Sequence, residues 1–307
     1  MESLGLILAY LAIGWVLQRT HSLPENSGLV LNQYVIHVAV PAMILLHLPS
    51  LEVSAAVLTP IFTPWAMFAL AIGLVLLCSR LFKWGRDLTG AMLIVVPLGN
   101  TSFLGFPMVE TFYGTSALPF AVLYDQAGSF LALALFTSVI AAHYANTQSG
   151  SKPSKKEQAV ALLRFPPLIA LLVALSVGQT EYPSMLQQLF EVLAATLVPV
   201  VMIAVGFQLK FKVLRADIPP FIIALSIKLL VLPLVALASF YWIGLNDVAA
   251  QVSVLEAAMP PMITAGALAM SAGLRPRLVA GIVGYGVVLG MATLPIMHWL
   301  TQQVLVA

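Results

Sequence analysis

Hydrophobic and polar positions divide this chain into long apolar stretches separated by short polar loops. A helix needs about 20 apolar residues to cross a bilayer, and ten stretches reach or approach that length. They are predicted as spans 1 to 10 at residues 4–17, 28–48, 61–82, 88–112, 117–142, 166–177, 185–209, 219–242, 248–271 and 278–300. The pattern therefore predicts an all-α integral membrane protein with ten transmembrane helices.

Composition supports this class. Of the 307 residues, 61% are hydrophobic and 8% are charged, and the mean hydropathy is +1.00. A soluble domain of this length would carry far more charge. The single cysteine, Cys78, excludes an intrachain disulfide. The first apolar stretch lacks a basic n-region and a small-residue cleavage site, so we interpret it as a span and not as a signal peptide.

Two of the spans contain residues that disfavour a continuous helix. Proline lacks an amide donor and clashes with the preceding turn, and glycine weakens a helix further. The breaks are predicted in 94–107 (IVVPLGNTSFLGFP) and 256–266 (EAAMPPMITAG), at Pro97, Gly99, Pro260 and Pro261. Two interrupted helices in corresponding halves of a chain indicate a transporter's binding site. Two proline kinks without a ligand are the alternative interpretation.

The one long polar segment, 146–158 (NTQSGSKPSKKEQ), has the composition of a flexible linker. It separates five spans from five, which predicts a first repeat at 1–145, a cytoplasmic linker at 146–158 and a second repeat at 159–307. Pro41 and Pro199 lie at similar places in spans 2 and 7. An odd number of spans per repeat inverts the second copy. We therefore expect an inverted 5+5 repeat in which the broken helices 4 and 9 cross.

Basic residues give the expected orientation, because cytoplasmic loops collect lysine and arginine. Thirteen of the 14 basic residues follow odd-numbered spans, and none follows an even-numbered span. The remaining one, Lys228, lies inside span 8. The pattern predicts a multi-pass protein of the cell inner membrane with both termini outside.

Ionisable side chains at membrane depth are costly and are functional candidates. Here these are Asp125, Lys228 and Glu256; a structural ion pair between Lys228 and one of the acids is the alternative. The freed carbonyls of a broken helix attract a cation and its freed amides attract an anion. The predicted substrate-binding residues are Asn100, Thr101, Ser102, Pro260, Met262 and Thr264, and the predicted ion-coupling residues are Asp125, Gln126, Ser129 and Glu256.

The coupling ion is left open at this point. Sodium would use oxygen ligands, predicted at Glu256, Asn100 and Ser129, whereas a proton would need one carboxylate. No other cofactor is expected.

The segment 99–107 (GNTSFLGFP) resembles the fourth-helix motif of the auxin efflux carrier family, which includes plant auxin exporters and bacterial carriers of malonate and malate. The resemblance covers essentially the whole chain, and the short central linker is similar to that of bacterial members. It implies a scaffold domain and a transport domain in which the broken helices cross.

The segment 255–268 (LEAAMPPMITAGAL) is also similar to the ninth helix of bile acid–sodium symporters, which share the fold. This second resemblance implies that Glu256 binds sodium. The chain departs from those symporters at Pro260 and Pro261, where they carry polar residues.

We therefore predict a secondary active transporter of a small organic anion, such as a mono- or dicarboxylate, that works by alternating access. An uncoupled channel or facilitator, or a membrane sensor of the same fold, is the alternative. The sequence contains no HExxH, GxGD or GxSxG motif for an enzyme and no GxxxxGK[ST] motif for ATP. The expected partners are the anion and the lipid bilayer, with no nucleic acid; a homodimer is left open.

Overall fold

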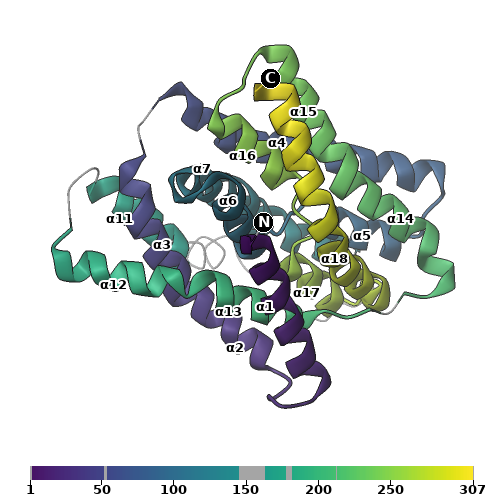
Figure 1. The fold of residues 1–307 in the computed structure, drawn as a ribbon. Helices are drawn as coiled ribbons and strands as arrows, with labels where there is room; N and C mark the ends of the chain where they lie inside the picture. The colour runs from purple at the N-terminus through teal and green to yellow at the C-terminus, as the bar shows by residue number, and fades with distance from the viewer. Residues whose placement is uncertain (1, 52–53, 145–162, 178–181, 212, 307) are drawn as a thin grey trace. The chain divides into compact units, whose positions relative to one another are not determined.

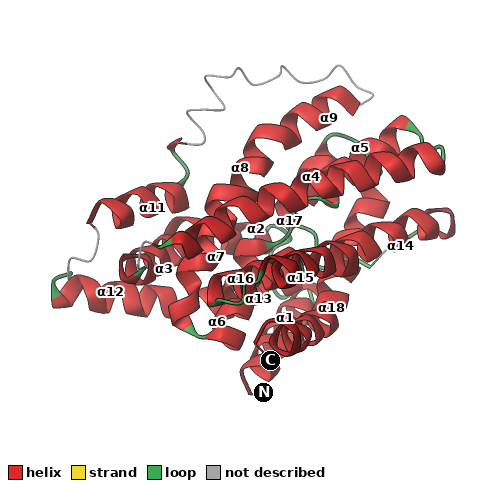
Figure 2. Cartoon of the chain, turned by 90° about the horizontal axis from the view of Figure 1, so that it is seen from above, coloured by secondary structure: helices red, strands yellow, loops and turns green. Residues whose placement is uncertain are grey.

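The computed structural model describes residues 2–51, 54–144, 163–177, 182–211 and 213–306. Its elements are helices joined by loops (Figure 2), and the described residues contain no strand beyond one isolated bridge. The predicted linker, 146–158, lies outside them. The chain forms two compact units, and each unit takes segments from both predicted repeats.

Unit 1 comprises Met1–Ser54, Ser102–Val122 and Lys155–Leu209. Its principal helices are α1 (Glu2–Arg19), α2 (Ser27–Tyr34), α3 (Val40–His47), α6 (Phe106–Tyr113), α11 (Pro166–Val177), α12 (Ser184–Ala195) and α13 (Leu197–Gln208). The helix α7 (Leu118–Tyr124) begins in this unit.

Glycines let α1 and α13 pack side by side in unit 1 (Figure 1). A Cβ on Gly14 would lie 2.1 Å from the Ile203 carbonyl oxygen, and a Cβ on Gly206 would lie 2.1 Å from the Leu11 carbonyl oxygen. Small residues that allow such backbone approach are typical of helix pairs in membranes.

Unit 2 comprises Ala55–Thr101, Leu123–Ser154 and Lys210–Ala307. Its helices include α4 (Leu58–Leu81), α5 (Arg86–Val95), α8 (Phe130–Ala132), α9 (Ser138–Tyr144), α14 (Ile218–Ser226), α15 (Leu232–Ile243), α16 (Val248–Ala257), α17 (Ile263–Ser271) and α18 (Pro276–Thr301). Within it α5 packs against both α4 and α9 (Figure 2).

Short π-helices precede several of the prolines. The segments η1 (Val35–Ala39), η4 (Thr101–Gly105) and η9 (Ile227–Val231) each end two residues before a proline, at Pro41, Pro107 and Pro233. A proline cannot donate to the carbonyl four residues earlier, and its ring crowds that turn. Widening of the preceding turn accommodates both effects, and such π segments are frequent at functional sites.

Proline also explains why the predicted span at 185–209 contains a turn. The helix α12 ends at Ala195, and α13 begins at Leu197. In a continuous helix Pro199 would have to donate to the Ala195 carbonyl, which it cannot do. At this turn the Thr196 hydroxyl donates to the Leu193 carbonyl at 2.6 Å.

Among the described residues, six helical stretches are long and apolar enough to cross a membrane. They are Ser27–His47, Ala55–Leu81, Thr115–Tyr144, Ser184–Gln208, Arg215–Ile243 and Pro276–Val306. Three shorter apolar helices are Leu4–Arg19, Pro166–Val177 and Val248–Ala257. The chain thus has the helical architecture of a multi-pass membrane protein.

Candidate functional site

The two interrupted segments meet in unit 2. Residues 96–100, which follow α5, and residues 258–262, which follow α16, lie outside helices. The Asn100 amide donates to the Pro260 carbonyl at 2.7 Å, and the Met262 amide donates to the Leu98 carbonyl at 2.9 Å. These bonds form an antiparallel bridge at Gly99. Amide and carbonyl groups that lack a partner within their own helix at each break are therefore partly satisfied by the other segment.

A buried polar cluster follows the first break. Asn100 and Thr101 are buried, as is Asp125, which begins the π-helix η6 (Asp125–Ser129). The Thr101 hydroxyl donates to Asp125 Oδ1 at 2.5 Å, and the Gln126 amide donates to Asp125 Oδ2 at 2.7 Å. Bonds to a carboxylate are shorter and stronger than bonds between neutral groups. The first break is thereby tied to η6.

The helix α4 also packs against η6, which the sequence interpretation missed. The Trp65 indole donates to the Ala127 carbonyl at 2.9 Å. A Cβ on Gly128 would lie 2.1 Å from Pro64 Cγ, so this position requires glycine. The signals in the sequence were Pro64 within span 3 and the glycine in the segment DQAGS, 125–129.

Lys228 and Glu256 are the other buried charged residues of the cluster, with 3% and 0% of their surfaces exposed. Lys228 Nζ donates to the Ala257 carbonyl at 3.3 Å. Lys228 and Glu256 line the same small cavity. A structural ion pair between Lys228 and one of the buried acids stays the alternative interpretation.

Several buried polar atoms near the crossing have no hydrogen-bond partner among the described residues. Such atoms are rare in native structures and indicate a binding or strained site. They are Asn100 Nδ2, Gln126 Oε1, Glu256 Oε1 and Glu256 Oε2.

Part of this cluster lines a small cavity. The volume open to the centre of a water-sized sphere is about 10 Å³, close to the minimum that holds one water molecule. It leaves no room for a carboxylic acid in this conformation. The residues around it include Pro97, Gly99, Thr101, Tyr124, Ser129, Lys228 and Glu256.

The remaining predicted residues lie in different environments. Pro260 and Pro261 are buried, and Met262 is 8% exposed. Thr264 is exposed on α17. Ser102 is half-buried and belongs to unit 1. Unit 2 therefore gathers the predicted polar residues into one buried group, without Ser102 and Thr264.

The predicted sodium ligands fit that ion only in part. Both Glu256 oxygens are available, and Ser129 lines the cavity. The unpartnered atom of Asn100, however, is its amide nitrogen, and hard cations require oxygen ligands. The charged Lys228 side chain lines the same small cavity. These residues do not fit a sodium ion while Lys228 carries its charge.

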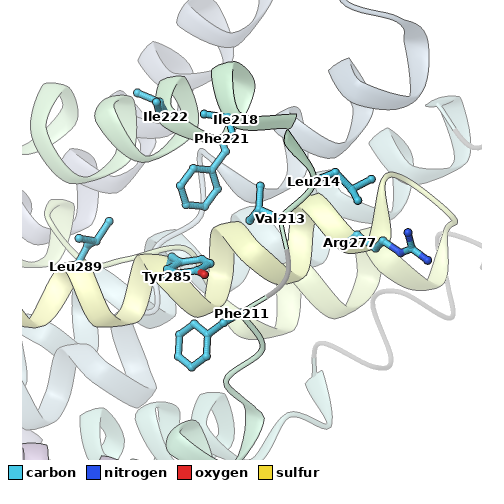
Figure 3. Close-up of a pocket in the computed structure, with 9 residues that line it drawn as sticks. All are labelled: Phe211, Val213, Leu214, Ile218, Phe221, Ile222, Arg277, Tyr285 and Leu289. Atoms are coloured by element: carbon cyan, nitrogen blue, oxygen red, sulfur yellow. The ribbon is translucent and has the colours of Figure 1, made fainter. Parts of the chain in front are cut away.

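A larger hollow in unit 2 contains none of the predicted site residues (Figure 3). It has a volume of about 760 Å³ and lies between the start of α14 and the face of α18. The Tyr285 ring packs edge-on against Phe211 and Phe221, with centroids 5.1 and 5.6 Å apart. The groove is mainly apolar, and Arg277 lies at one end of it (Figure 3).

An ionic cluster in unit 2 connects the first turn of α5, the 3-10 helix η8 (Arg215–Asp217) and Arg275, the residue before α18. Arg275, with a φ of 46°, donates to Asp87 at 2.6 Å and to Asp217 at 3.3 Å. The sequence interpretation used Arg275 only for orientation. Asp87 and Arg275 are partly exposed, whereas Asp217 is buried, so the pair between Asp87 and Arg275 contributes little stability by itself.

Comparison with known proteins gives the family. The chain belongs to the family described as membrane transport protein, which matches residues 1–298. This is the auxin efflux carrier family that the segment 99–107 resembles, so that prediction is confirmed. It is a family of transporters and not of enzymes.

Two relatives span nearly the whole chain. An uncharacterized transporter of Methanothermobacter thermautotrophicus is 26% identical over 301 residues, which cover 96% of each chain. An uncharacterized transporter of Methanocaldococcus jannaschii is 25% identical over 309 residues, which cover 98% of each chain. Both are similar to this chain along its length, in agreement with a membrane transporter.

Proposed function

We propose that this transporter is a secondary carrier of a small organic anion, a mono- or dicarboxylate, that works by alternating access. The observation that supports it is the crossing of two interrupted segments beside buried polar atoms without partners. No side chain caps the start of α17, so its first amides remain available to an anion. Interrupted helices with this arrangement hold substrates in secondary transporters.

We also propose ten membrane crossings in an inverted 5+5 repeat, with both termini outside the inner membrane. The apolar helices and the distribution of basic residues support this proposal. We further propose that unit 2 corresponds to the transport domain and unit 1 to the scaffold domain, because both breaks belong to unit 2.

Cysteine labelling tests the orientation. In a Cys78→Ala background, Ser151→Cys in the linker should react with a membrane-impermeant maleimide only after the cytoplasmic side is opened. A cysteine added after Ala307 should react in intact cells. Labelling of Ser151→Cys from the periplasmic side alone would refute the proposed orientation.

The substrate class is tested with purified protein. Malonate, succinate and acetate are compared with chloride at equal ionic strength in a thermal-shift screen. At least one carboxylate should raise the unfolding midpoint in a saturable way, since a ligand that binds the native state stabilises it. If none of these carboxylates and no longer dicarboxylate shifts the midpoint, the organic-anion proposal fails.

Counterflow in proteoliposomes separates a carrier from the alternatives. Labelled malonate outside should accumulate transiently when unlabelled malonate is loaded inside, with protein-free liposomes as the control. A channel gives no such overshoot, and a sensor binds the anion without moving it. The carrier proposal therefore requires saturable counterflow.

Coupling to a cation gradient is a further part of the proposal. Asp125 and Glu256 are the buried acids of the site, and we propose that at least one of them links anion movement to that gradient. Uptake driven by a proton gradient and uptake driven by a sodium gradient are measured separately for Asp125→Asn and Glu256→Gln. If both variants retain full gradient-driven uptake, neither residue couples.

A further inference from the structure

The end of α16 lacks two hydrogen-bond donors. In an α-helix each amide donates to the carbonyl four residues earlier. Residues 260 and 261 would therefore serve the carbonyls of Glu256 and Ala257, but both are proline and have no amide hydrogen. The Met259 amide reaches the Glu256 carbonyl at 3.2 Å. The Ala257 carbonyl receives Lys228 Nζ at 3.3 Å.

Lys228 thus supplies the donor that Pro261 lacks. It lies in the π-helix η9, between α14 and α15, and is 3% exposed. Lysine is almost never fully buried without a charged partner. Here its one hydrogen bond among the described residues goes to a main-chain carbonyl at the negative end of a helix. This is the environment that a bound cation would occupy.

Glu256 is the acid that faces this ammonium group across the small cavity. It is fully buried, and its carboxylate oxygens have no hydrogen-bond partner in the described part of the chain. Asp125, in contrast, accepts bonds from Thr101 and Gln126. Burying an uncompensated carboxylate is costly, and the ammonium of Lys228 is the positive group on the cavity wall that offsets it.

We propose that the Lys228 ammonium is a built-in monovalent cation, which takes the place of a coupling sodium ion at the end of α16. Two cations within a cavity of about 10 Å³ would repel each other strongly. Wild-type protein therefore binds no sodium at Glu256, and removal of the lysine charge creates a sodium site there. This inference deepens the proposed function by defining the cation at the crossing.

The test needs no substrate, so it remains informative if the organic-anion proposal fails. The unfolding midpoint of purified full-length protein is measured in sodium chloride and in choline chloride at equal ionic strength. Wild type should show no sodium-specific shift. Lys228→Met, which keeps the side-chain length without the charge, should gain a rise of a few degrees that saturates with sodium concentration.

Three variants serve as controls. Lys228→Met/Glu256→Gln should lose the sodium response, because the carboxylate ligand is gone. Lys228→Arg keeps the charge and should not gain a response. Lys83→Met removes an exposed lysine and should behave like wild type. A sodium response in wild type that Lys228→Met leaves unchanged would overturn the proposal, as would a folded Lys228→Met that ignores sodium.

Failure of Lys228→Met to fold would still test the idea. The proposal then requires that Glu256→Gln in the same chain restores folding, because it removes the uncompensated carboxylate. If Lys228→Met/Glu256→Gln is no better folded than Lys228→Met, Lys228 is only a structural donor to Ala257 and the proposal is wrong.

Discussion

The two helix breaks of unit 2 meet each other but present different chemistry. The first has one proline, Pro97, and is followed by the buried polar side chains of Asn100 and Thr101. The second has two adjacent prolines between Met259 and Met262, with no polar side chain among these four residues. Both breaks contribute main-chain groups to the bridge, and the first break is also followed by a side-chain hydrogen bond from Thr101.

A break with two adjacent prolines lacks two amide donors, so other segments must supply hydrogen-bond donors to its carbonyls. The carbonyls near Pro260 and Pro261 receive donors from other segments, namely the Asn100 amide and the Lys228 ammonium. The first break is held in addition by the side-chain bond from Thr101 to Asp125. Substitutions at the first break and at the second break should therefore have unequal effects on transport and on stability.

The largest effect is expected for Pro260→Ala/Pro261→Ala. Alanine restores two amides and has the highest helix propensity, so α16 and α17 can join into one helix. The bonds to Asn100 and Leu98 are then lost. Malonate counterflow should fall to the level of protein-free liposomes while the protein remains folded.

Pro295→Ala is the matched control, because Pro295 lies inside the uninterrupted helix α18. It should retain counterflow. Full counterflow in the double variant would show that the second break is dispensable, and the crossing would then not be the site.

The sequence predicted much of this arrangement, because prolines and glycines act locally. Pro97, Pro260 and Pro261 place the breaks from elementary backbone chemistry. The sequence predicted that the two breaks cross, but it did not predict the antiparallel bridge at Gly99. The register of that bridge depends on packing between segments far apart in the sequence.

Other features depend on tertiary contacts that a single sequence does not reveal. The support of Gly128 by Pro64 and the bond between Lys228 and the Ala257 carbonyl join different helices. The predicted roles of Thr264 and Ser102 rested on proximity in sequence and stay predictions. Thr264 lies exposed on α17, and Ser102 is half-buried directly after Thr101. The division of the chain into units also could not be predicted from its order alone.

Asn100→Ala should have the next largest effect. Its side-chain nitrogen is buried and has no partner among the described residues, so its loss should not lower the unfolding midpoint. A lost hydrogen bond to a charged ligand costs about 1.5–3 kcal/mol, or roughly ten- to a hundredfold in affinity. The affinity for the best carboxylate of the screen is measured by titration.

Asn32→Ala is the control for this change. Asn32 is also buried, but it lies in unit 1 and donates to Gln208 at 3.3 Å. It should leave carboxylate affinity unchanged and lower stability. The reverse pattern would place the anion in unit 1 and remove the first break from the site.

Thr101→Val should affect stability more than any comparable change at the second break. Valine keeps the shape of threonine but removes the 2.5 Å bond to Asp125. The expected loss is about 1.5–3 kcal/mol, the range for bonds to charged groups, measured by denaturant unfolding. Thr293→Val is the control, because that hydroxyl lies 3.5 Å from the Gly290 carbonyl and contributes little.

A double-mutant cycle sharpens this prediction. If Thr101 acts through Asp125, the losses in Thr101→Val and Asp125→Asn should not add in the double variant. Additive losses would mean that Thr101 stabilises the first break without the carboxylate.

The smallest effect is expected for Gly99→Ala, at the bridge between the breaks. Gly99 does not have a positive φ, so alanine introduces no backbone strain. Its Cβ would lie 3.0 Å from Lys228 Nζ, and the end of a lysine side chain can move by a few tenths of an ångström.

Gly128→Ala faces the rigid Pro64 ring at 2.1 Å and should cost about 1–3 kcal/mol. Gly99→Ala should cost less than about 1 kcal/mol, because restricting the unfolded chain offsets part of the strain. Equal losses in denaturant unfolding would mean that Lys228 is held as rigidly as the proline ring, and a movable ammonium group at the second break would be ruled out.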